Sequence, residues 1–180
     1  MTPAMPPSAH PEDILLPASS PGQTSRGQRF GYRPRLPESH GLLGLALPAE
    51  PISISVARAA VRRWLAEWSW PAEQLEDIVL AVNEAVSNAI EHAYLDRPPG
   101  MVEIRGAIEA TPRAQRRVTV IVRDHGRWRP PPIDDESRRR GIPLMQACMD
   151  GVAIGQPDDK PVGTRVVLRS KAVPPGRKQC

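Results

Sequence analysis

The segment 80–94, LAVNEAVSNAIEHAY, carries three polar side chains at steps of four residues along an otherwise apolar stretch. Glu84, Asn88 and His92 would therefore follow one another along one side of a helix, one turn apart. Such groups could be arranged around a metal-bound phosphate. The same column is also typical of a solvated face, because the apolar stripe places Glu84 about opposite the core. Asparagine has low helix propensity, so Asn88 in mid-helix favours a function.

Three motifs further along combine a glycine with a polar side chain at the end of a predicted element. Asp124 and Gly126 follow a predicted strand, where a carboxylate could accept from an exocyclic amine and glycine would let a ring approach the backbone. Gly141 precedes a predicted helix whose free N–H groups would face an anion, and Thr164 offers a hydroxyl at a tight turn. Each motif alone is also typical of an ordinary turn. The motifs are RDHGRW (123–128), RRRGIPLM (138–145) and VGTRVVL (162–168).

Apolar periodicity predicts the helices that position these groups. The first covers residues 54–68, with Ser53 as its N-cap. The second carries its apolar stripe over residues 75–93, and Pro71 suits its first turn. A short third helix is expected over 141–149.

Strands are predicted where apolar and β-branched residues alternate or cluster between turn signals. The predicted strands are 42–47, 101–110, 117–122, 151–155 and 163–170. The order β-α-α-β-β-α-β-β predicts an α+β fold, a two-layer sandwich of a mixed sheet with helices on one face. A proline-rich tail over 1–40 and a shorter tail over 171–180 would flank one domain over 41–170.

Composition excludes several classes of protein. Lys and Arg outnumber Asp and Glu by only 24 to 20 in 180 residues, which is not the basic stripe typical of a nucleic-acid binder. Cys148 and Cys180 are too few for a disulfide framework or a zinc ribbon, and they fit a reducing cytosol. No secretory leader and no apolar run of the ~20 residues that span a bilayer is recognised. We therefore expect a cytoplasmic protein that binds neither a membrane nor nucleic acid directly.

Taken in order, the motifs resemble those of the anti-sigma-factor serine/threonine kinases of bacterial stress and sporulation switches. These kinases belong to the ATPase superfamily of gyrase, Hsp90, MutL and histidine kinases. NEAVSNAIEH (83–92) is similar to their N-box, and RDHGRW, RRGIPLM and GTRVVL are similar to their three glycine boxes. The similarity extends over about 42–169 and implies the Bergerat-type ATP-binding fold. Pro143 is a departure, because it stands where the second box usually has its second glycine.

The resemblance implies a role for each of the motif residues. Asn88 matches the asparagine that binds Mg²⁺, and Glu84 matches the general base that takes a proton from the attacking serine. Asp124 matches the residue that binds the adenine of ATP. Gly126, Gly141 and Thr164 match further nucleotide-binding positions, while His92 has no clear role.

The implied function is that of an anti-sigma factor with ATP-dependent kinase activity. Such a protein sequesters a sigma factor, phosphorylates a serine on an anti-anti-sigma partner, and forms a homodimer. Arg58, Arg62 and Arg63 on the first helix are candidates for a protein interface. Two alternatives stay open: a non-catalytic, nucleotide-dependent binding module of the same fold, and a detached histidine-kinase catalytic domain.

Overall fold

The computed structural model describes residues 41–95, 98–127, 141–157 and 162–175. These residues form eight elements in the predicted order. The elements are β1 (Leu42–Pro48), α1 (Pro51–Glu67), α2 (Ala72–His92), β2 (Met101–Ala110), β3 (Arg116–Asp124), α3 (Gly141–Cys148), β4 (Gly151–Gly155) and β5 (Arg165–Arg169). The predicted tail over 1–40 and the arginine run 138–140 lie outside the described residues.

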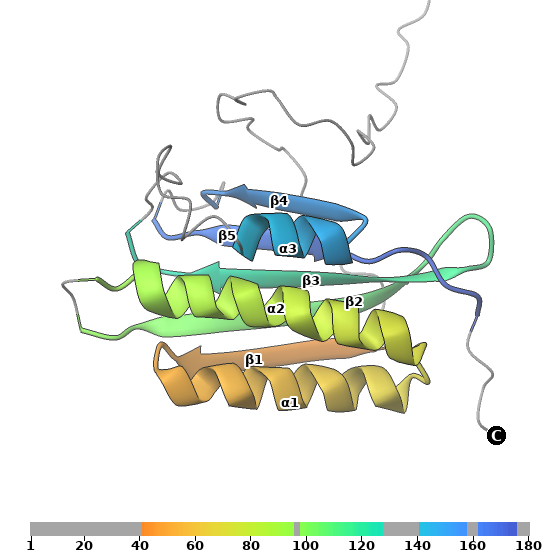
Figure 1. The fold of residues 1–180 in the computed structure, drawn as a ribbon, viewed down its shortest axis with the longest axis horizontal. Coiled ribbons are helices and arrows are strands. Elements are labelled where there is room, and N and C mark those ends of the chain that lie inside the picture. The colour runs from red at the N-terminus through yellow and green to blue at the C-terminus, as the bar shows by residue number, and fades with distance from the viewer. Residues whose placement is uncertain (1–40, 96–97, 128–140, 158–161, 176–180) are drawn as a thin grey trace, which may run out of the picture.

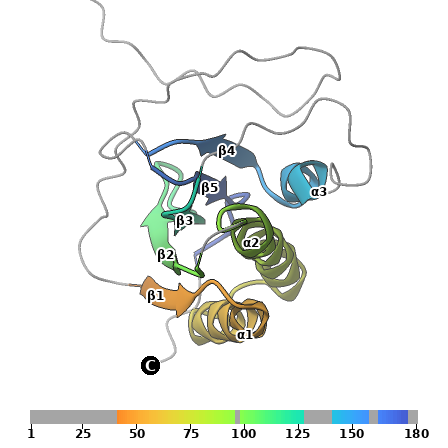
Figure 2. The same ribbon diagram turned by 90° about the vertical axis from the view of Figure 1, so that its left-hand side faces the viewer.

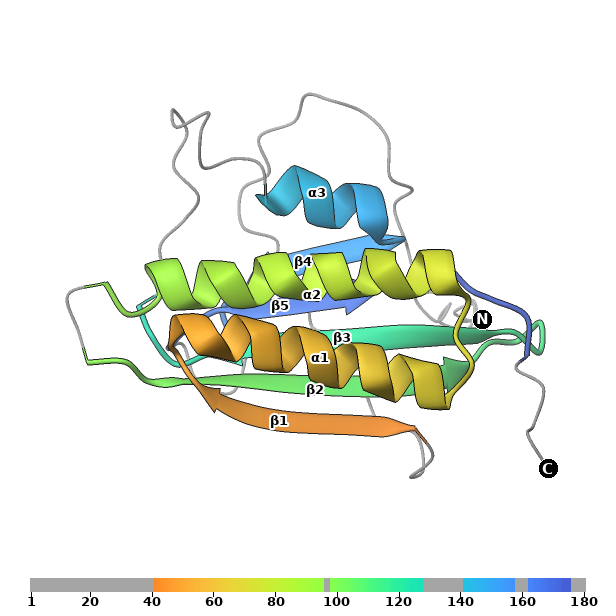
Figure 3. The same ribbon diagram turned by 60° about the horizontal axis from the view of Figure 1, so that its bottom comes forward.

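The α+β fold and its two layers are confirmed. Five strands form one sheet in the order β1-β2-β3-β5-β4. The three helices lie together on one face of this sheet (Figure 1), which the end-on view separates clearly from the strand layer (Figure 2). Within the helical layer α2 lies between α1 and α3 (Figure 3).

The described strand pairs are all antiparallel, whereas a mixed sheet was predicted. Two helices intervene between β1 and β2, so the chain returns to the end of the sheet at which β1 finished and β2 runs the other way. A single helix between β3 and β4 makes these strands parallel in direction, but β5 lies between them and pairs antiparallel with both. The element order alone does not reveal this insertion.

The core lies between the sheet and the apolar stripes of α1 and α2. Leu65, Ile78 and Val82 on the helices, and Ile104 and Val120 on the strands, are almost completely buried. Each fully buried aliphatic side chain contributes about 1.5–3 kcal/mol relative to exposure. This packing fixes α2 on the sheet and sets the direction of its other faces.

Two helix starts differ from prediction. The residue that precedes α1 is Glu50, and Ser53 lies inside the helix with 2% exposure, so Ser53 is not the N-cap. The helix instead begins with Pro51, a residue that is favoured in the first turn, and it has no side-chain cap. Pro71 directly precedes α2 rather than lying in its first turn.

Residues 171–175, predicted to belong to a C-terminal tail, include contacts with the domain. The backbone N–H and carbonyl of Val173 both bond to those of Arg116, at 2.8 Å, and the Val173 side chain is buried. In the part of the chain that the structure describes, no helix combines the length and apolar character needed to cross a membrane.

Candidate active site

The first part of the site lies where α3 begins against the side of α2. A methyl group placed on Gly141 would lie 3.2 Å from Oε2 of Glu84 and 3.3 Å from Nδ2 of Asn88. Gly141 is buried, and the two side chains are half-buried. The structure therefore brings together three of the predicted site residues, and the polar column is not a simple solvated face.

The apolar stripe of this helix did not predict that α3 packs beside Glu84 and Asn88, because the stripe indicates only which side of the helix faces the core. The start of α3 reaches α2 from the side, and the glycine at that point places no side chain of its own against the carboxylate of Glu84 and the amide of Asn88. His92, the last residue of α2, makes no hydrogen bond with Glu84, Asn88 or Asp124 within the described residues, so its role stays unassigned.

Asn83 is a polar neighbour of Glu84 that the sequence interpretation did not single out. Its Nδ2 atom lies 3.5 Å from Oε1 of Glu84, at the outer limit of a hydrogen bond. Its Oδ1 atom is buried and has no partner among the described residues. The carboxylate of Glu84 is thus bordered by an amide donor on α2 and by the backbone of α3.

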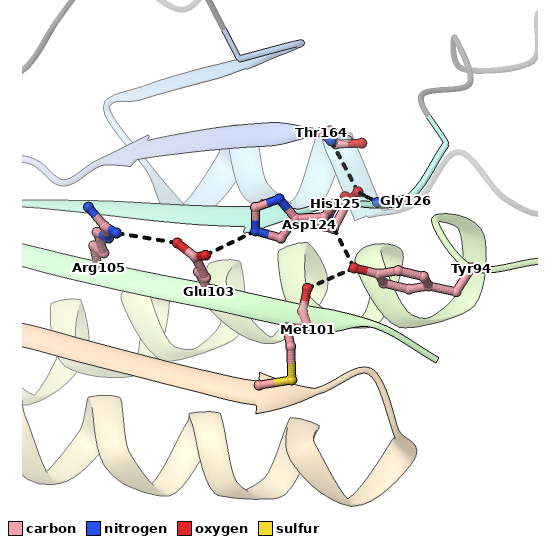
Figure 4. Close-up of polar contacts among 8 residues, drawn as sticks. All are labelled: Tyr94, Met101, Glu103, Arg105, Asp124, His125, Gly126 and Thr164. Atoms are coloured by element: carbon pink, nitrogen blue, oxygen red, sulfur yellow. Dashed lines mark hydrogen bonds and ion pairs between the residues drawn. The ribbon is translucent and has the colours of Figure 1, made fainter. Parts of the chain in front are cut away.

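The second part of the site is built around Asp124, the last residue of β3. The Asp124 side chain is buried, and its Oδ1 atom accepts hydrogen bonds from the backbone N–H groups of Gly126, at 2.9 Å, and Thr164, at 3.1 Å. The backbone N–H of Asp124 in turn donates to the carbonyl of Thr164 at 3.0 Å. The structure therefore brings Asp124, Gly126 and Thr164 together, as Figure 4 shows.

Burial raises the pKa of Asp124, and the hydrogen bonds from Gly126 and Thr164 oppose that rise. Removing the carboxylate from water disfavours its charge, whereas N–H donors stabilise it. A carboxyl group in this setting gains from a further donor. An exocyclic amine of a bound ring would be such a donor.

Two glycines let the surrounding backbones approach closely. A methyl group on Gly126 would lie 2.1 Å from the carbonyl oxygen of Ala93, at the end of α2. Gly163 has φ of +85°, and a methyl group there would lie 2.0 Å from the carbonyl oxygen of Asp124. Gly126 was predicted to admit a ring, and in the structure Ala93, directly after α2, also leaves no room for a side chain at this position.

A polar network next to Asp124 was not predicted. The Tyr94 hydroxyl accepts from the N–H of His125 at 3.0 Å and donates to the carbonyl of Met101 at 2.7 Å (Figure 4). The His125 ring lies 2.9 Å from Oε1 of Glu103, and this contact lowers the pKa of Glu103. A single tyrosine that bonds to backbone atoms leaves no repeating pattern in the sequence.

Comparison with known proteins fits this geometry. Residues 47–170 match the family model described as the histidine kinase-like ATPase domain. The anti-sigma F factor of Clostridium novyi (strain NT) is 30% identical over 128 residues, which are 65% of this chain and 85% of that protein. The serine-protein kinase RsbW of Bacillus subtilis (strain 168) is 30% identical over 82 residues, or 46% of this chain and 48% of that protein.

A solved structure supports the same assignment. The crystal structure of the RsbU and RsbW domains of Rv1364c from Mycobacterium tuberculosis aligns with a TM-score of 0.53 and 28% identity. The alignment covers 76% of this chain and 34% of that one. Because the family model spans more than half of the sequence and the fold agrees, the chain belongs to the histidine kinase-like ATPase domain family.

Proposed function

We propose that this chain is an anti-sigma factor and an ATP-dependent protein serine/threonine kinase. The observation that carries the proposal is the meeting of Glu84 and Asn88 on α2 with Gly141 at the start of α3. Family membership supports ATP as the nucleotide. Relatives named anti-sigma F factor and serine-protein kinase RsbW support the activity and its biological role.

The nucleobase end of the site is formed by Asp124, Gly126 and Thr164. Asp124 accepts a hydrogen bond from the exocyclic amine of adenine, while two backbone N–H groups hold its Oδ1 atom in place. A guanine has a carbonyl oxygen at that position, which would oppose the carboxylate. This arrangement favours ATP over GTP.

The phosphate end of the site is formed by the start of α3 and by Asn88. The amide oxygen of Asn88 and the carboxylate of Glu84 are hard oxygen donors, and no side chain at Gly141 separates them from α3, so these residues fit a Mg²⁺–phosphate group. Asn88 holds the ion, and the first N–H groups of α3 face the phosphates. When bound, Mg²⁺ neutralises charge on the phosphate oxygens.

Glu84 is the general base. Its carboxylate accepts the proton of a serine hydroxyl as the serine oxygen bonds to the γ-phosphorus, and ADP leaves. Asn83 and the start of α3 limit the positions that this carboxylate can take. The serine belongs to an anti-anti-sigma partner, and the sigma factor is held by another surface of the chain.

The sigma-factor surface includes α1. Arg58, Arg62 and Arg63 are exposed on this helix, and Arg62 pairs with Glu76 of α2. The pair is exposed, so a partner carboxylate can compete for Arg62.

Calorimetric titration and a phosphotransfer assay test the proposal. Wild type should bind ATP with Mg²⁺, and Asn88→Ala should lose most of the Mg²⁺-dependent affinity. Glu84→Gln should retain ATP binding and lose transfer of γ-phosphate to the partner serine, with acid-stable phosphoserine as the wild-type product. Unchanged transfer by Glu84→Gln would exclude Glu84 as the base.

Pro143 favours a second candidate, a nucleotide-dependent binding module without kinase activity. It is the third residue of α3 and lacks the N–H that another residue would offer at this end of the helix. A chain that binds ATP and the sigma factor but labels no serine would support this module and contradict the kinase.

A further inference from the structure

In residues 124–127, at the end of β3 and the start of the loop that follows it, every backbone N–H group is hydrogen-bonded. The four successive N–H groups from Asp124 to Arg127 donate to the Thr164 carbonyl, the Tyr94 hydroxyl, the Asp124 carboxylate and the Ala93 carbonyl, at 2.9–3.0 Å. Two of the four acceptors therefore belong to Ala93 and Tyr94, directly after α2. This is the helix that also carries Glu84 and Asn88.

Thr164 and Ala93 accept through backbone carbonyls, and the Asp124 carboxylate belongs to residues 124–127 themselves. Among these four acceptors, Tyr94 alone contributes a side chain from another part of the chain. Its hydroxyl joins His125 after β3 to Met101 at the start of β2. The phenol of Tyr94 is protonated at neutral pH and donates to the Met101 carbonyl, and burial raises its pKa further above the ordinary value of 10.0. One hydroxyl thus connects three segments of the chain.

The position of the Tyr94 ring is set by Gly100. A methyl group on Gly100 would lie 2.3 Å from Cε1 and 2.7 Å from the hydroxyl oxygen of Tyr94. No side chain can occupy that space while the ring remains where it is. The ring therefore lies directly against the backbone just before β2, and this contact aims the hydroxyl at His125 and Met101.

We propose that Tyr94 is a positioning residue that holds residues 124–127, which contain Asp124 and Gly126, in register with the end of α2 and thereby sets the selectivity for adenine. The inference rests on the proposed function, in which Asp124 binds the adenine amine. His125 lies between Asp124 and Gly126, so a shift of its N–H moves the peptide that sets the direction of the Asp124 carboxylate.

Tyr94→Phe is the first test, because it removes the hydroxyl and keeps the ring. The affinity for ATP, measured by calorimetry, should fall about five- to tenfold, as expected when the hydrogen bonds of a partly buried hydroxyl are lost. The affinity for GTP, which lacks the amine that Asp124 binds, should change less. The ratio of the two affinities should therefore fall, and a general loss of structure would not produce this change.

Thr111→Val is the matched control. It also removes one hydroxyl, but Thr111 follows β2 at the opposite end of the sheet from Met101. Its affinities for ATP and GTP should equal those of wild type. If Thr111→Val lowered the ATP:GTP ratio as much as Tyr94→Phe, the proposal would be wrong.

Gly100→Ala provides an independent route to the same state, because the added methyl group displaces the Tyr94 ring. It should lower the ATP:GTP ratio like Tyr94→Phe. The double variant should be little worse than the more severe single variant, since both changes act through one hydroxyl. Fully additive effects would contradict a shared mechanism.

The outcomes separate this inference from the proposed function. If wild type binds ATP and Tyr94→Phe binds it equally well, or loses ATP and GTP affinity in equal measure, Tyr94 is not a positioning residue and the proposed function stands. If wild type binds no ATP, both proposals fail.

Discussion

At the scale of single residues, Asp124 combines a buried carboxylate with the binding role proposed for it. Burial raises its pKa, and the backbone hydrogen bonds from Gly126 and Thr164 both go to one oxygen, Oδ1. Asp124→Asn keeps an oxygen that can accept those two bonds and removes the buried charge. We expect Asp124→Asn to unfold at the same or a higher temperature than wild type, with a free energy of unfolding within about 1 kcal/mol of the wild-type value. The variant should bind ATP about tenfold or more weakly. Thermal unfolding and calorimetry of the same samples measure both effects.

The same substitution tests the electrostatics of Asp124. A carboxyl whose pKa is raised by folding binds its proton more tightly in the folded state, so its contribution to stability is full below its ordinary value of 3.8 and is lost as the pH rises through the raised value. The free energy of unfolding of wild type should therefore fall relative to Asp124→Asn as the pH rises above 3.8. A difference that grows in the opposite direction would mean that hydrogen bonds outweigh burial at Asp124.

The sequence singles out candidate residues where their own side chains form the motifs. Glu84 and Asn88 stand out because they are polar groups in an apolar helix, and Asp124 because it follows a predicted strand and precedes Gly126 by two residues. Asn83 and Tyr94 do not stand out, because their importance depends on which atoms the fold places beside them. Backbone acceptors and donors have the same chemistry at every position, so no sequence pattern identifies them.

At the scale of elements, the glycines that join α2 to the strand ends should be the least tolerant of change. Gly126→Ala would place a methyl group 2.1 Å from the Ala93 carbonyl oxygen, a backbone atom that cannot rotate away. We expect a loss of at least about 2 kcal/mol in the free energy of unfolding. Gly155→Ala in β4, where nothing lies within 4 Å, should change it by less than about 1 kcal/mol. Denaturant unfolding of the two variants compares them, and equal stabilities would refute the close contact.

Gly141→Ala should separate stability from catalysis. The added methyl group would meet flexible side chains, at 3.2 Å from Glu84 and 3.3 Å from Asn88, and alanine favours a helix over glycine by about 1 kcal/mol. Stability should therefore be retained within about 1 kcal/mol, while single-turnover phosphotransfer slows about tenfold or more because the base is displaced. Normal transfer would show that the proposed phosphate end of the site lies elsewhere.

The elements themselves were predictable because each has a strong apolar period. The bounds of α2, α3 and β2 lie within a few residues of the predicted ranges. Strand direction was less predictable. The position of β5 between β3 and β4 depends on which strand packs next to β3, and the apolar period of a strand does not contain that information.

At the scale of the whole molecule, the domain extends further than hydrophobicity indicates. Residues 171–175 contain few apolar side chains, so composition assigned them to a tail. In the structure, Val173 is held by two backbone hydrogen bonds to Arg116. These contacts are made by backbone groups and by the long side chain of Arg116. Neither produces a periodic pattern of apolar residues in the sequence.

Arg116 is the residue that joins this C-terminal segment to the helical layer. Its guanidinium donates to the carbonyls of Trp68, Ser69 and Pro174, and it lies 4.8 Å from the centroid of the Trp70 ring. Partial burial lowers its pKa, yet arginine remains charged at neutral pH. The turn between α1 and α2 and the end of the domain thus share one cation, which satisfies carbonyls that α1 leaves without partners.

Arg116→Ala should therefore destabilise the domain by about 2 kcal/mol, whereas Arg113→Ala, which removes the same charge from an exposed position in the neighbouring turn, should have little effect. A chain that ends at residue 171 should also lose stability, because the Val173 and Pro174 contacts are absent. Adding Arg116→Ala to that truncation should cost less than it does in the full chain, since the two changes share a partner. Urea unfolding of the four proteins beside wild type measures this coupling. If Arg113→Ala and Arg116→Ala lowered stability equally, net charge rather than the contacts of Arg116 would explain the effect.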